Sequence, residues 1–228
     1  MRLRAEYSVG PELKYLSNFD LMHLMQRALR RGGIDYALSQ GFNPHIKLSM
    51  GTVLPVGLWG LKEYFDLELK ADIELASFIR QMNRVLPPAV RIHRSISLPG
   101  GEPSLMKMIN AASYSFSCRP GAILWDKIAA DLESASELIV PGKGKKKNVN
   151  KDIRPGIFHG AIENDAGFDI IRIWVSSGSV NNVRFDELKE ALSALGMPEE
   201  KLAEVYRCGN YAMYDGHFYS PLEKVKDY

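Results

Sequence analysis

Hydrophobic and polar residues follow two different periods in the first part of the chain. Apolar residues alternate with charged ones from Arg2 to Val9, which is typical of a strand that is buried on one face only. Behind Ser17, a residue type that caps helices well, apolar residues recur at spacings of three and four until Gly32, which predicts an amphipathic helix. Both patterns recur before residue 98. They predict a strand at 2–9, a helix at 17–31, strands at 45–50 and 64–69, a helix at 72–86 and a strand at 90–98.

This order of elements is that of a ferredoxin-like βαββαβ fold, in which two helices cover one face of a four-stranded antiparallel sheet. The other face of the sheet is expected to stay open. A second cycle follows, with a strand at 113–119, a helix at 123–134, strands at 157–162 and 168–175, a helix at 185–195 and a strand at 205–213. The predicted fold class is therefore α+β, with two tandem ferredoxin-like halves and antiparallel sheets. We expect a first domain at 1–98, a linker at 99–112, and a second domain at 113–228 with a basic loop at 141–154.

The composition is that of an ordinary globular protein. The chain has 228 residues, of which 46% are hydrophobic and 25% charged, so a core is available without disulfides. Its two cysteines, Cys118 and Cys208, lie far apart and outside any CxxC pair, which argues against a disulfide framework and against a thiolate metal site. No apolar stretch is long enough to span a membrane, and the N-terminus lacks the apolar core of a signal peptide. We therefore expect a cytoplasmic protein without a membrane partner.

Charge is concentrated in one segment. The net charge is only +2, yet residues 141–154, PGKGKKKNVNKDIR, contain six basic residues and one acidic residue. A basic segment within a slightly acidic remainder suits a polyanionic partner, and RNA phosphates are the expected one. A solvated flexible loop without a ligand is the alternative. The basic residues are Lys143, Lys145, Lys146, Lys147, Lys151 and Arg154, of which Lys151 is not among the expected phosphate contacts.

A second basic group is predicted on the polar side of the helix at 17–31. His23, Arg27, Arg30 and Arg31 recur at spacings of about one helical turn and therefore project together. The three arginines are candidates for phosphate contacts. The alternative is a solvated helix face.

The segment Ser39–His45, SQGFNPH, is a specific short motif. It places amides, one aromatic ring and one imidazole in a turn directly before a predicted strand. We expect Gln40, Phe42, Asn43 and His45 to contact RNA bases or sugars, with the Phe42 ring as a stacking surface. The alternative is a structural turn whose amides satisfy nearby backbone groups and whose phenylalanine fills the core.

The chain carries no motif of a metal or nucleotide site. Its five histidines form neither an HxH nor an HExxH arrangement, and neither a GxSxG elbow nor a GxxxxGK[ST] phosphate loop is present. We therefore expect no metal and no cofactor. Acid–base chemistry by His23, Tyr36 or His45 on a bound backbone phosphate, as in metal-independent RNA cleavage, stays open.

Two longer segments carry a resemblance to a known family. The run YLSNFDLMHLMQRALRRGGIDYALSQGFNPHIKLSMGTVLPVGLWGLKEYFDLEL and the later GKGKKKNVNKDIRP resemble the bacterial radical SAM-associated (radical SAM-linked) proteins. That family is a domain of unknown function found beside, or fused to, radical S-adenosylmethionine enzymes. The resemblance implies a companion of a radical enzyme and not the enzyme itself. The chain agrees, because it has no CxxxCxxC triplet to bind the iron–sulfur cluster.

Three classes of function follow. The favoured one is a non-catalytic accessory protein that binds transfer or ribosomal RNA in a basic groove formed by the two halves, for a partner that modifies or processes RNA. The second is a metal-independent RNA-processing enzyme, which rests on analogy between folds. The third is a protein adaptor of the radical enzyme that does not bind RNA and uses apolar side chains, with Leu54, Val56, Leu58 and Trp59 as candidates.

Overall fold

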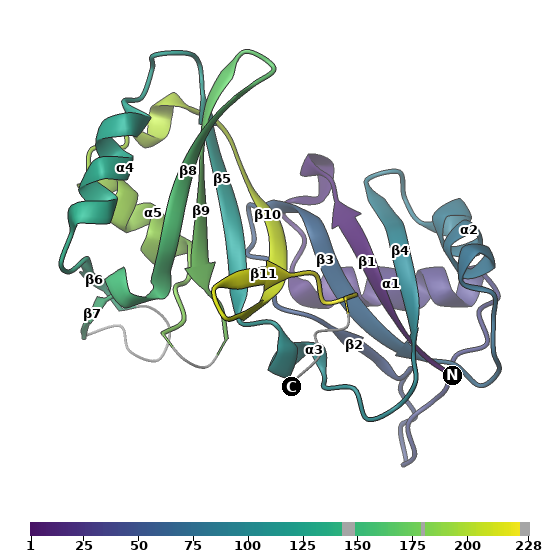
Figure 1. Ribbon diagram of the computed structural model, residues 1–228. Coiled ribbons are helices and arrows are strands. Elements are labelled where there is room, and N and C mark those ends of the chain that lie inside the picture. Colours follow the sequence, from purple (N-terminus) through teal and green to yellow (C-terminus); the bar gives the residue numbers. More distant parts are fainter. Residues whose placement is uncertain (143–148, 179–180, 224–228) are drawn as a thin grey trace. The chain divides into compact units, whose positions relative to one another are not determined.

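The computed structural model describes residues 1–142, 149–178 and 181–223 (Figure 1). The chain forms two compact units, of which the first contains Met1–Ile109 and Gly209–Tyr228 and the second contains Asn110–Cys208. The sequence-based division assigned the last residues of the chain to the second half. The difference arises at strand β10 (Leu202–Tyr214), which begins in the second unit and ends in the first.

The first unit contains an antiparallel sheet. Its strands lie in the order β4, β1, β3, β10; β2 also pairs with β3, and β11 pairs with β10. The elements of this unit are β1 (Arg2–Val9), the 3-10 helix η1 (Pro11–Leu13), α1 (Asn18–Arg31), β2 (Leu48–Met50), β3 (Trp59–Glu68), α2 (Leu75–Val85), β4 (Val90–Leu98), α3 (Leu105–Met108) and β11 (His217–Tyr219).

Helices α1 and α2 cover one face of this sheet. The apolar residues of β1 and β3 on that face, such as Leu3 and Phe65, are fully buried against Met25 of α1 and Phe78 of α2. These helices begin and end near the positions that the periodicity predicts, and Ser17 is the N-cap of α1. The strand predicted at 45–50 is shorter, since only Leu48–Met50 pairs as a strand.

The expectation of an open second sheet face is wrong for the first unit. The chain itself covers part of that face with Leu105 and Ile109, from the segment around α3, and with Leu222 near the end of the described chain. These three side chains pack against Tyr64 of β3 and are at most 5% exposed. The apolar residues Leu105 and Ile109 are therefore explained by packing onto the sheet.

The second unit repeats the mixture of helices and antiparallel strands. Its strands lie in the order β10, β5, β9, β8, and a separate hairpin is formed by β6 and β7. Its elements are β5 (Ala111–Cys118), α4 (Trp125–Ser134), β6 (Ile139–Pro141), β7 (Asn150–Asp152), the 3-10 helix η3 (Arg154–Gly156), β8 (Ile157–Asp165), β9 (Phe168–Ser176), α5 (Phe185–Ala194) and the 3-10 helix η4 (Glu199–Lys201).

One face of the second sheet is apolar and carries the helices. Phe116 of β5 stacks with Phe185 of α5 at a ring-centroid distance of 6.0 Å, and Ile171 and Ile173 of β9 are fully buried. The expected α+β class with antiparallel strands is confirmed at this level. No helix among the described residues has the length and apolar character needed to cross a membrane.

Candidate nucleic-acid interface

The SQGFNPH motif forms a projecting loop in the first unit. Its two ends are joined by a hydrogen bond from the Ser39 amide to the His45 carbonyl (2.8 Å) and by one from the His45 amide to the Ser39 hydroxyl (2.9 Å). Gly41 has a φ of +132°, a conformation that residues with a Cβ rarely adopt. The loop is therefore closed at its neck, and the motif supplies the residues that this turn needs.

The loop carries its candidate side chains into solvent. Gln40, Phe42, Asn43 and His45 are all exposed, and the relative exposure of Phe42 is 107%. This exposure excludes the alternative in which Phe42 fills the core. A phenylalanine in this position adds nothing to the apolar packing of the fold, but its ring is accessible to a planar ligand.

The base of the loop is attached to strand β3. Backbone hydrogen bonds run from Ala37 to the Glu68 carbonyl (2.8 Å) and from Lys47 to the Ala37 carbonyl (2.9 Å). The Lys47 ammonium pairs with the Glu68 carboxylate at 2.7 Å, although both side chains are largely exposed and the pair adds little stability. The loop thus projects from an ordered part of the sheet.

The candidate arginines of α1 lie on its C-terminal half. Arg27, Arg30 and Arg31 are exposed, and Arg31 donates a hydrogen bond from Nη2 to the Val85 carbonyl of α2 (2.8 Å). Cations in the last helical turn also stabilise the negative end of the helix dipole, so Arg30 and Arg31 have a structural role as well. At the other end, the Ser17 hydroxyl donates a hydrogen bond to Asp20, which lowers the pKa of that carboxyl.

The basic segment is described only at its ends. Lys143, Lys145, Lys146 and Lys147 lie outside the described residues. The residues that follow hold the β6–β7 hairpin in place: Lys151 pairs with the buried Glu187 of α5 at 2.6 Å, and one Asp152 oxygen accepts hydrogen bonds from the amides of Leu138 and Arg154.

The Arg154 guanidinium is occupied by backbone carbonyls. It donates to the carbonyls of Ile157 (2.9 Å), Ala135 (3.1 Å) and Glu133 (3.4 Å). The sequence analysis predicts that Arg154 contacts phosphates. The contacts instead give Arg154 a structural role, in which it ties η3 to the C-terminal end of α4.

The remaining candidates for chemistry do not form a cluster. Among the described residues, no group of three His, Cys, Asp or Glu side chains could hold a metal ion. His23 and His45 are exposed, on α1 and on the projecting loop respectively. Burial raises the pKa of the Cys208 thiol, which keeps it protonated and unreactive.

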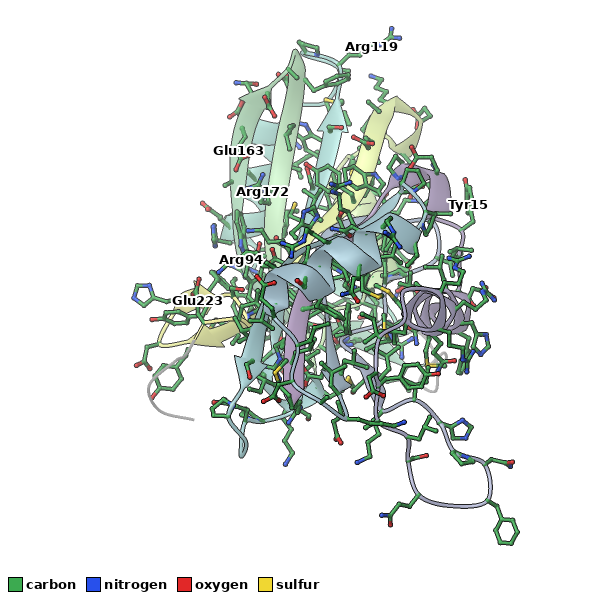
Figure 2. The ribbon with its side chains drawn as sticks, turned by 90° about the vertical axis from the view of Figure 1, so that its right-hand side faces the viewer. Tyr15, Arg94, Arg119, Glu163, Arg172 and Glu223 are labelled. Carbon is green, nitrogen blue, oxygen red and sulfur yellow. The ribbon has the colours of Figure 1, made fainter. Side chains whose placement is uncertain are left out.

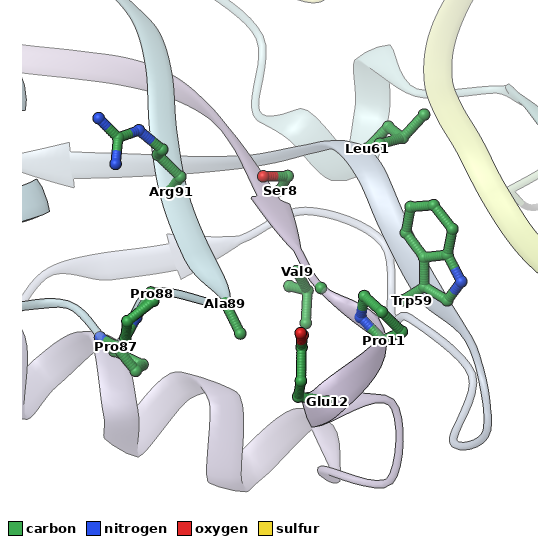
Figure 3. A pocket seen from close by; sticks show the side chains of 11 residues that line it. Ser8, Val9, Pro11, Glu12, Trp59, Leu61, Pro87, Pro88, Ala89 and Arg91 are labelled. Carbon is green, nitrogen blue, oxygen red and sulfur yellow. The ribbon is translucent and has the colours of Figure 1, made fainter.

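An apolar groove lies at the end of β1, where β4 begins (Figure 3). Its volume is about 560 Å³, and Glu12 and Arg91 are the charged residues that line it. Figure 3 shows Trp59 and Pro11 on one side of the groove and Pro87 and Pro88 on the other.

Two of the four apolar residues considered for an adaptor surface belong to the core. Leu58 is 3% exposed, and Leu54 packs against the core of the first unit. Val56 is 62% exposed, and Trp59 lines the groove. The sequence does not distinguish the two core residues from the other two, because apolar residues in this loop follow no regular period.

Comparison with known proteins places the chain in a family. Residues 2–185 match the family described as "Uncharacterized protein conserved in bacteria (DUF2344)". The chain belongs to this family. Nothing in this match concerns radical S-adenosylmethionine enzymes, so that part of the resemblance stays an expectation. A search of curated proteins finds no match.

Two solved structures share low similarity with this DUF2344 chain. A chain of a Cbf5-Nop10-Gar1 complex has 14% identity and a TM-score of 0.46, with 92% of the present chain covered. The present chain spans 48% of that chain. An unknown protein from Galdieria sulphuraria has 12% identity and a TM-score of 0.26, with 90% of the present chain and 96% of the other covered.

The sequence analysis missed a polar stack on the second sheet. Arg172 of β9 lies over the Trp174 ring (5.7 Å to its centroid), and the His159 ring stacks on Trp174 at 4.3 Å. Arg172 also pairs with Glu163 of β8 at 2.9 Å, and Figure 2 labels this pair. The signal was present in the alternation of Arg172 and Trp174 with buried isoleucines, which marks the sheet face opposite the helices. The Trp174 ring thus has two neighbours within the sheet, and these contacts stabilise the sheet.

A buried polar network in the first unit was also missed. Arg4 and Asp66, 1% and 4% exposed, form two hydrogen bonds with each other, from Nε (2.7 Å) and from Nη2 (3.0 Å). Beside them the Tyr64 hydroxyl donates to the Glu6 carboxylate (2.7 Å), and burial raises the pKa of Tyr64. The alternation from Arg2 to Val9 predicts that Arg4 and Glu6 face solvent, so it gives no sign of this network.

Proposed function

We propose that the chain is an accessory protein that binds single-stranded RNA and presents it to an RNA-modifying or RNA-processing enzyme. The observation that carries the proposal is the fully exposed Phe42 ring on a loop whose neck is closed by hydrogen bonds. Sequence-specific RNA recognition uses unpaired bases, which stack on aromatic side chains and form hydrogen bonds along their edges. Gln40, Asn43 and His45 supply donors and acceptors beside the ring.

Phosphate contacts are assigned to exposed cations. Arg27 and Arg31 of α1 are exposed, and the lysines at 143 and 145–147 add a basic segment to the sequence. Phosphate contacts give affinity without base preference, whereas the loop would give base contacts. Loss of a phosphate contact should therefore change the salt dependence of binding, whereas loss of a loop contact should change the sequence preference.

We also propose that each of the two units has a ferredoxin-like fold. In the first unit β4, which follows α2, lies beside β1, and β1 lies beside β3. In the second unit β10, which follows α5, lies beside β5, and β5 lies beside β9. This order supports two ferredoxin-like units, a shape that occurs in RNA-binding modules. The enzyme partner that we propose is a radical S-adenosylmethionine enzyme, on the strength of the sequence resemblance.

The test is a binding measurement with a labelled single-stranded RNA of mixed sequence. We expect Phe42→Ala to weaken binding by roughly 5- to 150-fold, the range that loss of one stacked base implies. Phe42→Trp should preserve binding. Tyr15 is a matched control, because it is an aromatic residue of the same unit with 73% exposure, and Tyr15→Ala should leave affinity unchanged.

Two results would refute the proposal. Equal affinity of wild type and Phe42→Ala would remove the loop from RNA recognition. Absence of binding to any RNA pool at low salt would remove RNA binding altogether. Gel analysis of the same RNA after incubation in chelator separates a binder from a metal-independent nuclease, because shortened fragments that disappear in His45→Ala would support the enzyme.

The groove at the end of β1 favours a second candidate, a protein adaptor. Its walls are mainly apolar, and Leu61, which lines it, is 41% exposed. Exposed apolar surface of this kind is common at protein contacts. Co-expression with the neighbouring radical enzyme, nuclease treatment and gel filtration test this candidate. A complex that forms with wild type and not with Leu61→Asp would support it, whereas separate elution of the two wild-type proteins would contradict it.

A further inference from the structure

A second, smaller groove lies between α1 and the C-terminal end of α2. Its volume is about 340 Å³. Two of its lining residues are arginines, the others are apolar, and no carboxylate lines it. The lining residues are Leu24, Arg27, Arg31, Val85, Leu86 and Pro87.

The two arginines reach the groove from adjacent turns of α1. Residues four apart on a helix are neighbours on its surface, so Arg27 and Arg31 lie on the same flank. The hydrogen bond from Arg31 Nη2 to the Val85 carbonyl (2.8 Å) fixes this guanidinium against the last turn of α2. Arg27 forms no hydrogen bond or ion pair within the described part of the chain, so its donors are available.

An anion that lies between two exposed cations is attracted by both. Guanidinium groups bind phosphate oxygens with paired hydrogen bonds, and Arg is favoured over Lys where that planar geometry matters. The apolar wall of Leu24, Leu86 and Pro87 can pack against the carbon atoms of a sugar. The groove therefore has the chemistry for a phosphate attached to a ribose.

We propose that this groove holds one phosphodiester of the bound RNA strand between Arg27 and Arg31. The inference rests on the proposed RNA-binding function and deepens it, because it separates the three arginines of α1 into two that bind a phosphate and one that does not. Arg30 is exposed and lies in the last turn of α1, but it does not line the groove.

Arg30 is therefore a matched control for charge. A structural role for the arginines, such as stabilising the negative end of the helix dipole, would be shared by Arg30 and Arg31. A general attraction of RNA to the charge of α1 would be shared by all three. Only a specific site in the groove predicts that Arg27 and Arg31 matter and that Arg30 does not.

The first experiment measures RNA affinity against salt concentration for three variants. We expect the double variant Arg27→Gln/Arg31→Gln to bind a labelled single-stranded RNA roughly 10- to 100-fold more weakly at low salt, as loss of charge-assisted hydrogen bonds implies. The slope of log affinity against log salt should fall by about 0.7, the value for one phosphate contact on a single strand. Arg30→Gln should leave both close to wild type.

The second experiment tests the groove without RNA. The Nε–H signals of the arginines are followed by NMR while inorganic phosphate is added. We expect the signals of Arg27 and Arg31 to shift until the groove is saturated with phosphate, and the signal of Arg30 to shift little. Arg27→Gln removes no contact that holds the fold, so this single variant gives the same test if the double variant is unstable.

The outcomes separate the two proposals. Equal losses in Arg30→Gln and in the groove variants, or equal phosphate shifts at all three arginines, would overturn the groove while RNA binding stands. If wild type binds no RNA, the proposed function fails, and the phosphate titration then decides whether the groove is an anion site on its own. Absence of any phosphate shift at Arg27, with RNA affinity unaffected by Arg27→Gln, would refute the inference.

Discussion

Replacing Arg4 with Met should destabilise the first unit strongly. All five donors of the buried Arg4 guanidinium have acceptors. Nε and Nη2 bond to the Asp66 carboxylate, Nη2 also bonds to the Pro103 carbonyl (2.9 Å), and Nη1 bonds to the Pro221 carbonyl (3.2 Å) and the Met108 sulfur (3.0 Å). The side chain thereby joins β1 and β3 to both segments that cover the sheet.

The size of the effect follows from what the substitution leaves behind. Methionine nearly matches the length of the aliphatic stem of arginine, so little of the volume of that stem is lost. Asp66 stays 4% exposed and, among the described residues, keeps the ion pair with Arg2, while the carbonyls of Pro103 and Pro221 lose a donor. Removal of one member of a buried ion pair costs about 3–5 kcal/mol. The double variant Arg4→Met/Asp66→Leu removes both charges and should recover a large part of this loss.

Hydrogen exchange measured by mass spectrometry gives the stability of this unit directly. If the amides of β1 exchange through opening of the unit, about 3–5 kcal/mol corresponds to exchange that is faster by two to nearly four orders of magnitude. Amides of β9, in the second unit, serve as the internal reference. Exchange of β1 within about threefold of wild type in the single variant would refute the reasoning, as would a double variant that is less stable than the single one.

Three further predictions concern stability. Ser17→Ala should cost α1 about 1 kcal/mol in urea denaturation, because the cap accepts from the Asp20 amide. The pKa of Asp20 is lowered in the folded state, so the part of this loss that comes from the hydroxyl–carboxylate bond is complete above the unfolded pKa and disappears as pH falls through the folded pKa. The difference between variant and wild type should therefore narrow in acid without vanishing. Tyr64→Phe removes the 2.7 Å hydrogen bond to the buried Glu6 and should lower the melting temperature at neutral pH. Arg154→Ala should speed hydrogen exchange in η3 and at the C-terminal end of α4 about tenfold or more, since three carbonyls there lose their donor.

The long elements were predictable from the sequence because each has one buried face. The period of α1 is clear between Ser17 and Gly32, and that of β1 alternates over its whole length. The short elements β6, β7 and β11 have three residues each, too few to show a period. Their positions depend on pairing with a neighbouring strand, which the sequence alone does not state.

The buried charges were not predictable from pattern alone. An alternating strand indicates that every second residue leaves the core, and Arg4, Glu6 and Asp66 do so. It does not indicate whether water or another part of the chain lies beyond them. Here the segment around α3 and the residues near 221 lie there, about 100 and 217 positions from Arg4 along the chain. A contact over such a separation leaves no local trace in the sequence.

The covering of the first sheet changes where RNA can be recognised. The sequence analysis expected an open sheet face, and an open face would let bases stack on strand residues. In the first unit the corresponding face holds Leu105, Ile109 and Leu222 over Tyr64, so that tyrosine is 1% exposed and offers no stacking surface. We therefore assign the proposed base contacts in this unit to side chains that project beyond the sheet. Phe42 is such a side chain, and since its ring contributes nothing to the core, its replacement separates recognition from stability more cleanly than any substitution on the strands.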